Sequence, residues 1–319
     1  MRRASAPSRR WRRLGTLGVA AVLVATAACD AMFGVRALST ARPGTTTYHA
    51  LASGGTTRRF LLHLPPQAAR GRVPLVLAFH GHDGNGATLR ESSGLDAAAD
   101  ALGFAVAYPD GTGRFRWVGL AWNAATCCGR AHARAVDDVA FADAVIAAAA
   151  HAAPVDTTRI FAVGFSAGGM LALRLACERA GTYAAVADVA GTMPDAACAP
   201  ARPVSVLLIQ GAEDDELRDD LRELRQPHGH PFAHSLEAAF AFWARHDGCA
   251  GAQVRDSSGA RVVTRASSCA SRRAVELYTV AGHPHAWPGG RRTWFFAPSP
   301  SKGVDASRVV LAFFATERR

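Results

Sequence analysis

Seven short apolar runs, separated by segments of helical pattern, constrain the fold of this chain more than any other feature. The run at residues 75–79 (LVLAF) has no polar alternation, which suits a strand buried on both faces of a sheet. Strands that alternate with helices favour a mostly parallel sheet covered by helices on both faces. The predicted strands are residues 60–64, 73–79, 104–108, 160–165, 184–189, 204–209 and 275–280; the predicted helices are 96–102, 137–152, 167–180, 231–246 and 305–315.

Length and composition favour one domain of this α/β class. The 319 residues are 49% hydrophobic, which is enough for one large core, and no internal repeat or long linker is visible. The irregular segment 247–273 is expected to leave the sheet as an excursion.

Residues 160–169 (IFAVGFSAGG) place Ser166 between two glycines, where a predicted strand meets a predicted helix. This is the pattern of a nucleophile elbow, a sharp turn that needs nearly side-chain-free residues two before and two after the serine. Gly164 and Gly168 meet that need. Because the chain has 30 glycines, chance alone would supply such a match in roughly one of seven similar chains. The flanking strand and helix therefore carry the prediction.

Polar residues follow several of the predicted strands, where parallel sheets carry their function. A serine nucleophile needs a histidine to take its proton, an acid to orient that histidine, and amide donors for the oxyanion. Ser166, Asp214 and His285 supply the first three in the chain order of α/β-hydrolases. The backbone N–H groups of Ala167 and His82 are the candidates for the oxyanion hole.

Two of these assignments have competitors nearby. His283 lies in the same Gly/Pro-bounded loop as His285, which we prefer among the 12 histidines. Asp214 belongs to a run of four carboxylates at 213–216, in which Asp215 and Glu213 are the other candidates for the acid. Such a run also suits a solvated loop.

Several further motifs accompany the elbow: HG at 80–81, YPDG at 108–111, WN at 122–123, CCG at 127–129, VDDV at 136–139 and HAWPG at 285–289. With them the chain resembles, over residues 60–314, secreted α/β-hydrolase esterases that include polyhydroxybutyrate depolymerase-like enzymes and bacterial feruloyl or acetylxylan esterases. The resemblance implies Ser166 as nucleophile, Asp214 as acid and His285 as base. It also implies Trp287 beside the base on the substrate side, and a structural role for Asp138.

The chain departs from that family around the acid. The family's acid lies in an HGT-x-D stretch followed by apolar residues and proline, whereas residues 210–216 read QGAEDDE. The position of Asp214 matches, but its surroundings differ.

The amino terminus has the parts of an export signal. Residues 1–28 contain six arginines, an apolar stretch and small residues before Cys29, which stands where a bacterial lipoprotein carries its lipid. We predict a signal peptide at 1–28, a flexible arm at 29–46 and the catalytic domain at 47–319. The mature protein is then secreted or periplasmic, and a lipid on Cys29 is the single predicted membrane attachment.

The six cysteines after Cys29 suit an exported protein because they can pair completely. Fifteen pairings are possible. Cys249 and Cys269 flank a short polar segment, which favours a local disulfide, and the pairing of Cys127, Cys128, Cys177 and Cys198 stays open. No zinc-ligand spacing appears, so no metal is expected.

These observations predict a monomeric carboxylic-ester hydrolase that works through an acyl-enzyme without metal or cofactor. Polyhydroxybutyrate-type oligoesters and feruloyl or acetyl esters of polysaccharides are the expected substrates. The alternatives are a serine peptidase of the same superfamily and a non-catalytic surface-binding lipoprotein. Nucleic acid is not an expected partner: the net charge is +10, but the six arginines within the first 13 residues leave about +4 for the rest.

Overall fold

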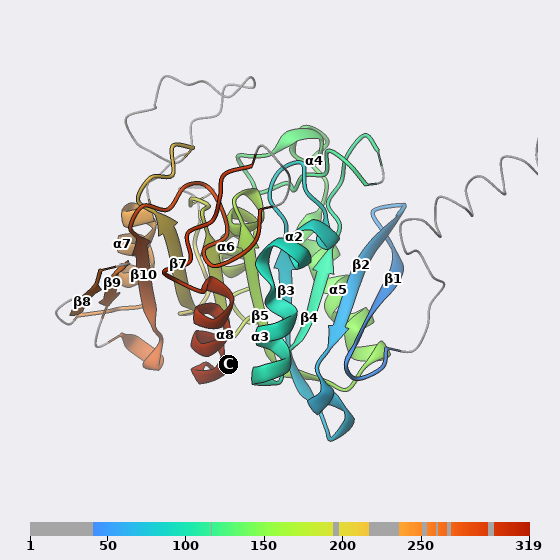
Figure 1. The fold of residues 1–319 in the computed structure, drawn as a ribbon. Helices are drawn as coiled ribbons and strands as arrows, with labels where there is room; N and C mark the ends of the chain where they lie inside the picture. The colour runs from blue at the N-terminus through green and yellow to red at the C-terminus, as the bar shows by residue number, and fades with distance from the viewer. Residues whose placement is uncertain are drawn as a thin grey trace, which may run out of the picture. The chain divides into compact units, whose positions relative to one another are not determined.

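The computed structural model describes residues 41–115, 117–193, 198–216, 236–250, 254–259, 261–266, 269–292 and 297–319. Ten described strands form one sheet in the order β1-β2-β4-β3-β5-β6-β7-β10-β9-β8 (Figure 1). The strands are β1 (Thr45–Ser53), β2 (Thr56–Leu64), β3 (Val73–Phe79), β4 (Ala105–Pro109), β5 (Val155–Phe165), β6 (Ala185–Val189), β7 (Ser205–Gly211), β8 (Val254–Ser258), β9 (Arg261–Ala266) and β10 (Val275–Val280).

Helices cover both faces of this sheet. The cores show the two layers: residues of α2, α3 and α8 pack on one face, and residues of α5, α6 and α7 pack on the other (Figure 1). The described helices are α2 (Gly86–Ser93), α3 (Leu95–Leu102), α4 (Gly129–Ala133), α5 (Asp138–Ala152), α6 (Ala167–Glu178), α7 (Leu236–His246) and α8 (Ala306–Thr316), with short 3-10 turns at Pro66–Ala69 and Ala270–Arg272.

β3 shows why the continuous apolar runs mark the centre of the sheet. Leu75 and Leu77 point into the core beneath α5 and α6, whereas Val76 and Ala78 point into the core beneath α3 and α8. All four side chains are fully buried. Burying a leucine or valine contributes about 1.5 to 3 kcal/mol, so both faces of this strand stabilise the fold.

The six central strands, β4, β3, β5, β6, β7 and β10, pair in parallel, which confirms the predicted mostly parallel α/β sheet. Antiparallel pairs flank them: β1 and β2 at one edge, β9 and β8 at the other. The segment 247–273 was expected to leave the sheet, and this expectation is wrong. β9 pairs with β10 and β8 with β9, because an edge strand can hydrogen-bond without an apolar run.

Residues 1–40, which include the predicted export signal and Cys29, lie outside the described residues, as does most of the predicted arm. β1 begins at Thr45, two residues before the predicted start of the domain. Among the helices that the structure describes, none combines the length and the apolar character that a membrane crossing requires.

Candidate active site

The structure contains the sharp strand-to-helix turn that the glycine spacing predicted. β5 ends at Phe165, α6 begins at Ala167, and Ser166 between them has φ 53° and ψ −121°, a strained conformation for a residue with a side chain. A Cβ on Gly164 would overlap the backbone of Gly168, and a Cβ on Gly168 would overlap the carbonyl of Phe79 in β3. Only glycine allows these backbones to approach so closely.

His285 and Asp214 meet at the carboxyl end of the sheet. Asp214 follows β7 and His285 follows β10, and these two strands are parallel neighbours. Nδ1 of His285 donates to the Asp214 carboxylate, 2.9 Å from Oδ2 and 3.1 Å from Oδ1. The ring of His285 also packs 5.0 Å from that of Phe165, the residue before Ser166. The fold therefore brings the three predicted residues to one place.

The competing candidates have other positions. His283 is buried; its Nε2 donates to the carbonyl of Ala286, and its Nδ1 accepts from the backbone N–H of Ser301. Both nitrogens are thus used in bracing the loop. Glu213 and Asp215 are exposed, and Asp214 is the member of the run whose carboxylate is buried against His285.

The loop after β3 is held rigidly beside the elbow. Buried His80 donates from Nδ1 to the carbonyl of Gly81 and accepts at Nε2 from the backbone of Gly111, and Trp122 donates to the His80 carbonyl. Burial lowers the pKa of His80 to about 4, so its ring is neutral at pH 7. Within the described chain, no hydrogen bond uses the backbone N–H of His82. That group and the first N–H of α6, on Ala167, remain available to a ligand.

Comparisons with known proteins identify the family. A family model described as "Esterase PHB depolymerase" matches residues 58–218. The "Putative esterase NocK" of Nocardia uniformis subsp. tsuyamanensis is 36% identical over 285 residues, which cover 82% of this chain and 79% of that relative. The chain belongs to the esterase PHB depolymerase family. Feruloyl esterase B of Piromyces equi is 31% identical to this esterase over 230 residues, which cover 70% of this chain and 41% of the relative.

Solved structures agree on the fold of the esterase. An acetyl xylan esterase from Aspergillus awamori superposes with a TM-score of 0.54 at 13% identity, covering 75% of this chain and 94% of that one. An S-formylglutathione hydrolase from Agrobacterium tumefaciens gives a TM-score of 0.52 at 15% identity, covering 78% and 91%. At such low identity these likenesses establish the α/β-hydrolase fold, as predicted.

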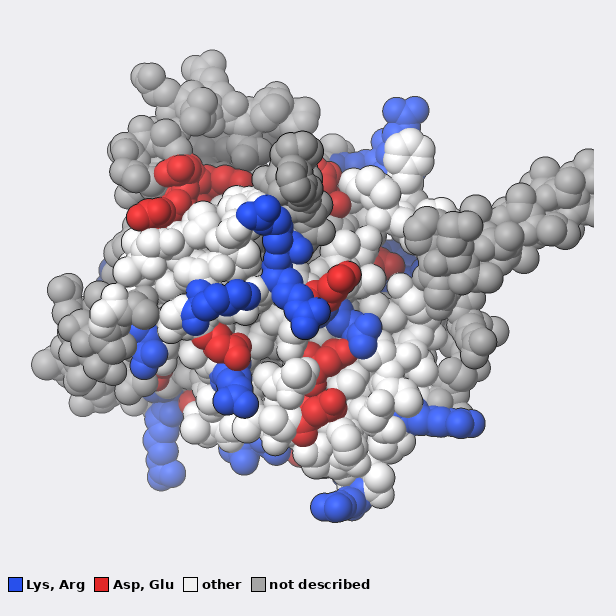
Figure 2. Space-filling view, in the orientation of Figure 1, with Lys and Arg blue, Asp and Glu red and all other residues white. Residues whose placement is uncertain are grey.

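His285 of the esterase has a second carboxylate on its other ring nitrogen. Oε2 of Glu216 lies 3.3 Å from Nε2 of His285, and the Glu216 side chain is 64% exposed. Burial alone would lower the pKa of His285, but the hydrogen bond to Asp214 and the charges of Asp214 and Glu216 raise it overall. Figure 2 shows acidic side chains at the edge of the molecule above β7 and β10. The sequence placed Glu216 in the carboxylate run but could not predict this contact.

Trp287, which the resemblance placed beside the base on the substrate side, packs inward in the structure, and its role toward a substrate stays a prediction. Its indole is 3% exposed and donates to the hydroxyl of Ser307 in α8, within the core beneath that helix. An indole of this size reduces its contact with water most by packing inward. Trp287 therefore anchors the loop that carries His285.

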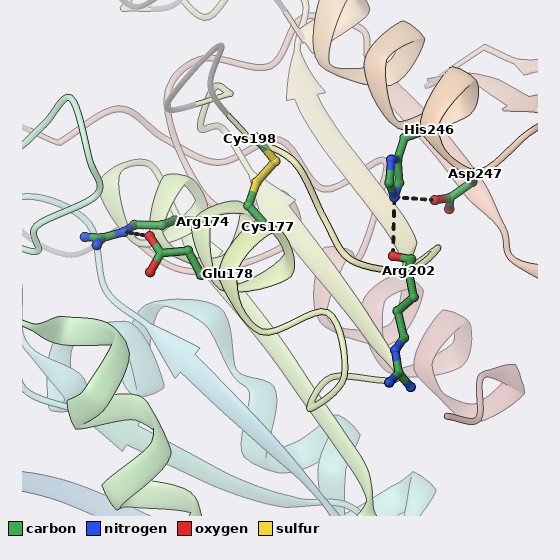
Figure 3. Close-up of a disulfide and its surroundings, with 7 residues drawn as sticks. All are labelled: Arg174, Cys177, Glu178, Cys198, Arg202, His246 and Asp247. Carbon is green, nitrogen blue, oxygen red and sulfur yellow. Dashed lines mark hydrogen bonds and ion pairs between the residues drawn. A yellow bond between two sulfur atoms is a disulfide. The ribbon is translucent and has the colours of Figure 1, made fainter.

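Three disulfides join the six cysteines. Cys249 pairs with Cys269, Cys127 with Cys128, and Cys177 with Cys198. Cys128 packs against Ala167, so the Cys127–Cys128 pair forms part of the wall beside the elbow. Cys177 lies in α6, and its disulfide ties that helix to the segment that leads into β7 (Figure 3).

The same segment is also joined to α7. His246, near the end of that helix, lies 3.3 Å from the carbonyl of Arg202, as Figure 3 shows. The segment that leads into β7 is therefore held by a disulfide to α6, the helix after Ser166, and by a polar contact to α7. These links fix the strand that precedes Asp214.

A buried carboxylate that sequence reasoning missed lies behind the elbow. Asp188 in β6 is fully buried, and a Cβ on Gly169 or Gly191 would overlap its carboxylate. Burial raises the pKa of Asp188 well above its ordinary value, and the charge of nearby Asp214 raises it further. The absence of side chains at Gly169 and Gly191 therefore leaves the space that this carboxyl occupies behind the elbow.

Proposed function

We propose that the esterase hydrolyses carboxylic esters through an acyl-enzyme formed on Ser166. The observation that carries the proposal is the contact of His285 with buried Asp214 beside the strained turn that presents Ser166. A histidine oriented by an acid next to a partly exposed serine is the arrangement that makes a hydroxyl nucleophilic.

In the first half-reaction, Oγ of Ser166 attacks the ester carbonyl carbon while Nε2 of His285 takes the hydroxyl proton. The carbonyl oxygen becomes an anion, which the backbone N–H groups of Ala167 and His82 stabilise. The C–O bond to the alcohol breaks, and His285 gives the proton to the departing alkoxide. Asp214 stabilises the imidazolium throughout.

In the second half-reaction, water attacks the acyl carbon and loses a proton to Nε2 of His285. The bond to Oγ breaks, and His285 returns the proton to Ser166 as the carboxylic acid leaves. All atoms of the reaction come from the ester and one water molecule.

Replacement of the nucleophile tests the proposal. Ser166→Ala should lower kcat/KM for a nitrophenyl butyrate ester by about 10⁴-fold or more, since no other group can form the acyl-enzyme. Ser53→Ala, at the end of edge strand β1, is the matched control and should keep full activity. Equal thermal unfolding of the variants would show that the fold is intact, and an unchanged rate in Ser166→Ala would refute the assignment.

A peptidase of the same superfamily would use the same residues, because an amide carbonyl accepts the same attack. Family membership favours ester over amide cleavage and disfavours a non-catalytic binding protein. Turnover of a matched ester and amide pair decides between the first two, and we expect the ester to react faster.

For the acyl group, the relatives named feruloyl esterase and acetylxylan esterase support esters of plant polysaccharide, and the family description supports hydroxybutyrate oligomers. We propose one of these oxygen esters as the substrate. Product analysis with feruloylated, acetylated and hydroxybutyrate oligomers would show which of these esters is hydrolysed fastest.

We also propose that the esterase is exported and acts as a monomer. Three disulfides fit an oxidising compartment. Mass spectrometry of the mature amino terminus would test cleavage after residue 28 and lipid on Cys29.

A further inference from the structure

The catalytic role proposed for His285 requires its Nε2 to face the hydroxyl of Ser166. Within the described chain, no hydrogen bond joins these two groups, and the nearest charged group on Nε2 is the carboxylate of Glu216 at 3.3 Å. With Nδ1 already donating to Asp214, a carboxylate on Nε2 is attractive only when Nε2 also carries a proton. When His285 is protonated, this geometry places its imidazolium between two carboxylates.

We propose that Glu216 is a positioning residue that holds protonated His285 away from Ser166 and so raises the pH at which the esterase becomes active. The inference rests on the proposed function of His285. Because Glu216 is 64% exposed, its side chain can swing into solvent at little cost when Nε2 loses its proton and turns to the serine.

The charges around His285 make this role specific to Glu216. Asp214, from the end of β7, is fully buried and contacts Nδ1. His283, in the same loop after β10, is buried with both nitrogens in hydrogen bonds, and burial lowers its pKa. The elbow side presents the uncharged ring of Phe165. Asp188, from β6, is a buried carboxyl behind the elbow, and burial raises its pKa well above its ordinary value.

The sign of the pH effect follows from these charges. A negative group at Nε2 stabilises the imidazolium, so Glu216 raises the pKa of His285. The base must be neutral to accept the serine proton, and the acid limb of kcat/KM reports the pKa of the base in the free enzyme. Removing the charge should therefore move that limb to lower pH.

The test compares Glu216→Gln with Glu213→Gln in the full-length protein. Glu213 is an exposed carboxylate of the same loop, so its variant removes the same charge without touching His285. In Glu216→Gln the midpoint of the acid limb should fall by about 0.5 to 1 pH unit, the effect of one exposed charge at this distance. The plateau rate at high pH should stay within about twofold, and Glu213→Gln should move the midpoint much less.

A second measurement separates this inference from the proposed function. The pKa of the His285 imidazole can be followed by ¹⁵N NMR in the Ser166→Ala background, where catalysis plays no part. There Glu216→Gln should lower that pKa by the same amount. An unchanged pKa, or equal shifts in the two glutamate variants, would overturn the inference, whatever the activity assay says about Ser166.

Discussion

His285 lies between two carboxylates that differ in burial, and the difference decides their roles. Asp214 is fully buried and contacts Nδ1 at 2.9 Å, a strong and fixed hydrogen bond. Glu216 contacts Nε2 from a largely exposed position, where water weakens its charge. The buried acid can orient the ring and support catalysis, whereas the exposed one can adjust its protonation.

Asp214→Asn should therefore do far more damage than removal of the neighbouring charge. The amide can present an N–H to Nδ1 and so favour the wrong tautomer, for which we expect kcat to fall by about 10⁴-fold. The hydrogen bond and charge of Asp214 raise the pKa of His285, so the residual activity should extend to lower pH. Steady-state kinetics across pH 4 to 9 measures both effects.

Asp215→Asn is the matched control, since this exposed residue is next in the chain. We expect its kcat to stay within about twofold of that of the unmodified esterase. A larger loss in Asp215→Asn than in Asp214→Asn would mean that the acid has been assigned to the wrong carboxylate.

At the scale of elements, the junction of β5 and α6 depends on the absence of side chains. Gly164→Ala would force a Cβ into the backbone of Gly168, and overpacking of this kind costs about 1 to 3 kcal/mol or more. We expect a lower free energy of unfolding in urea and a loss of esterase activity. Gly71→Ala, where a Cβ meets nothing within 4 Å, should leave both within error. If Gly164→Ala and Gly71→Ala have the same free energy of unfolding, close packing does not explain why residue 164 is a glycine.

The sequence predicted the elements whose side chains are buried on two faces. β3 and the second half of β5, residues 160–165, are continuous apolar runs because helices cover both of their sides, whereas the polar first half of β5 was not predicted. β8 (VRDSS) and β1 (TTTYHALAS) lie at the two edges of the sheet and carry polar residues, so no apolar run marked them. α2 was missed for a similar reason: it is short and polar, and a capping box at Asn85 defines its start.

For the site, chain order and strand ends indicated Ser166, Asp214 and His285 without coordinates. The contact of Glu216 with Nε2 could not be predicted, because it depends on the path of a loop two residues beyond the acid. The Cys127–Cys128 pair was equally hidden, since six cysteines allow fifteen pairings. The sequence also did not indicate that Trp287 packs inward against the core.

Across the whole molecule, a buried ion pair joins residues 80 positions apart. Arg58 in β2 donates to Asp138 at the start of α5 at 2.7 Å, and the other carboxylate oxygen accepts from the backbone of Asn123. The side chains are 6% and 0% exposed. Removing one partner would leave a buried charge without compensation, which costs about 3 to 5 kcal/mol.

Asp138→Ala should accordingly lower the free energy of unfolding by that amount in urea titrations at pH 7. Asp137→Ala removes the adjacent carboxylate, which caps α5 through the backbone of Ala140, and should cost about 1 kcal/mol. Comparable losses in the two variants would show that the ion pair adds no more than a helix cap.

Identifying the residue that a fluorophosphonate modifies would show whether Ser166 forms the covalent intermediate. The full-length esterase is treated with the probe at pH 8, digested, and mapped by mass spectrometry. We predict a single adduct on the peptide that contains Ser166, formed in step with loss of ester hydrolysis and absent from Ser166→Ala. Modification of a different serine, or full activity after complete labelling of Ser166, would show that Ser166 is not the nucleophile.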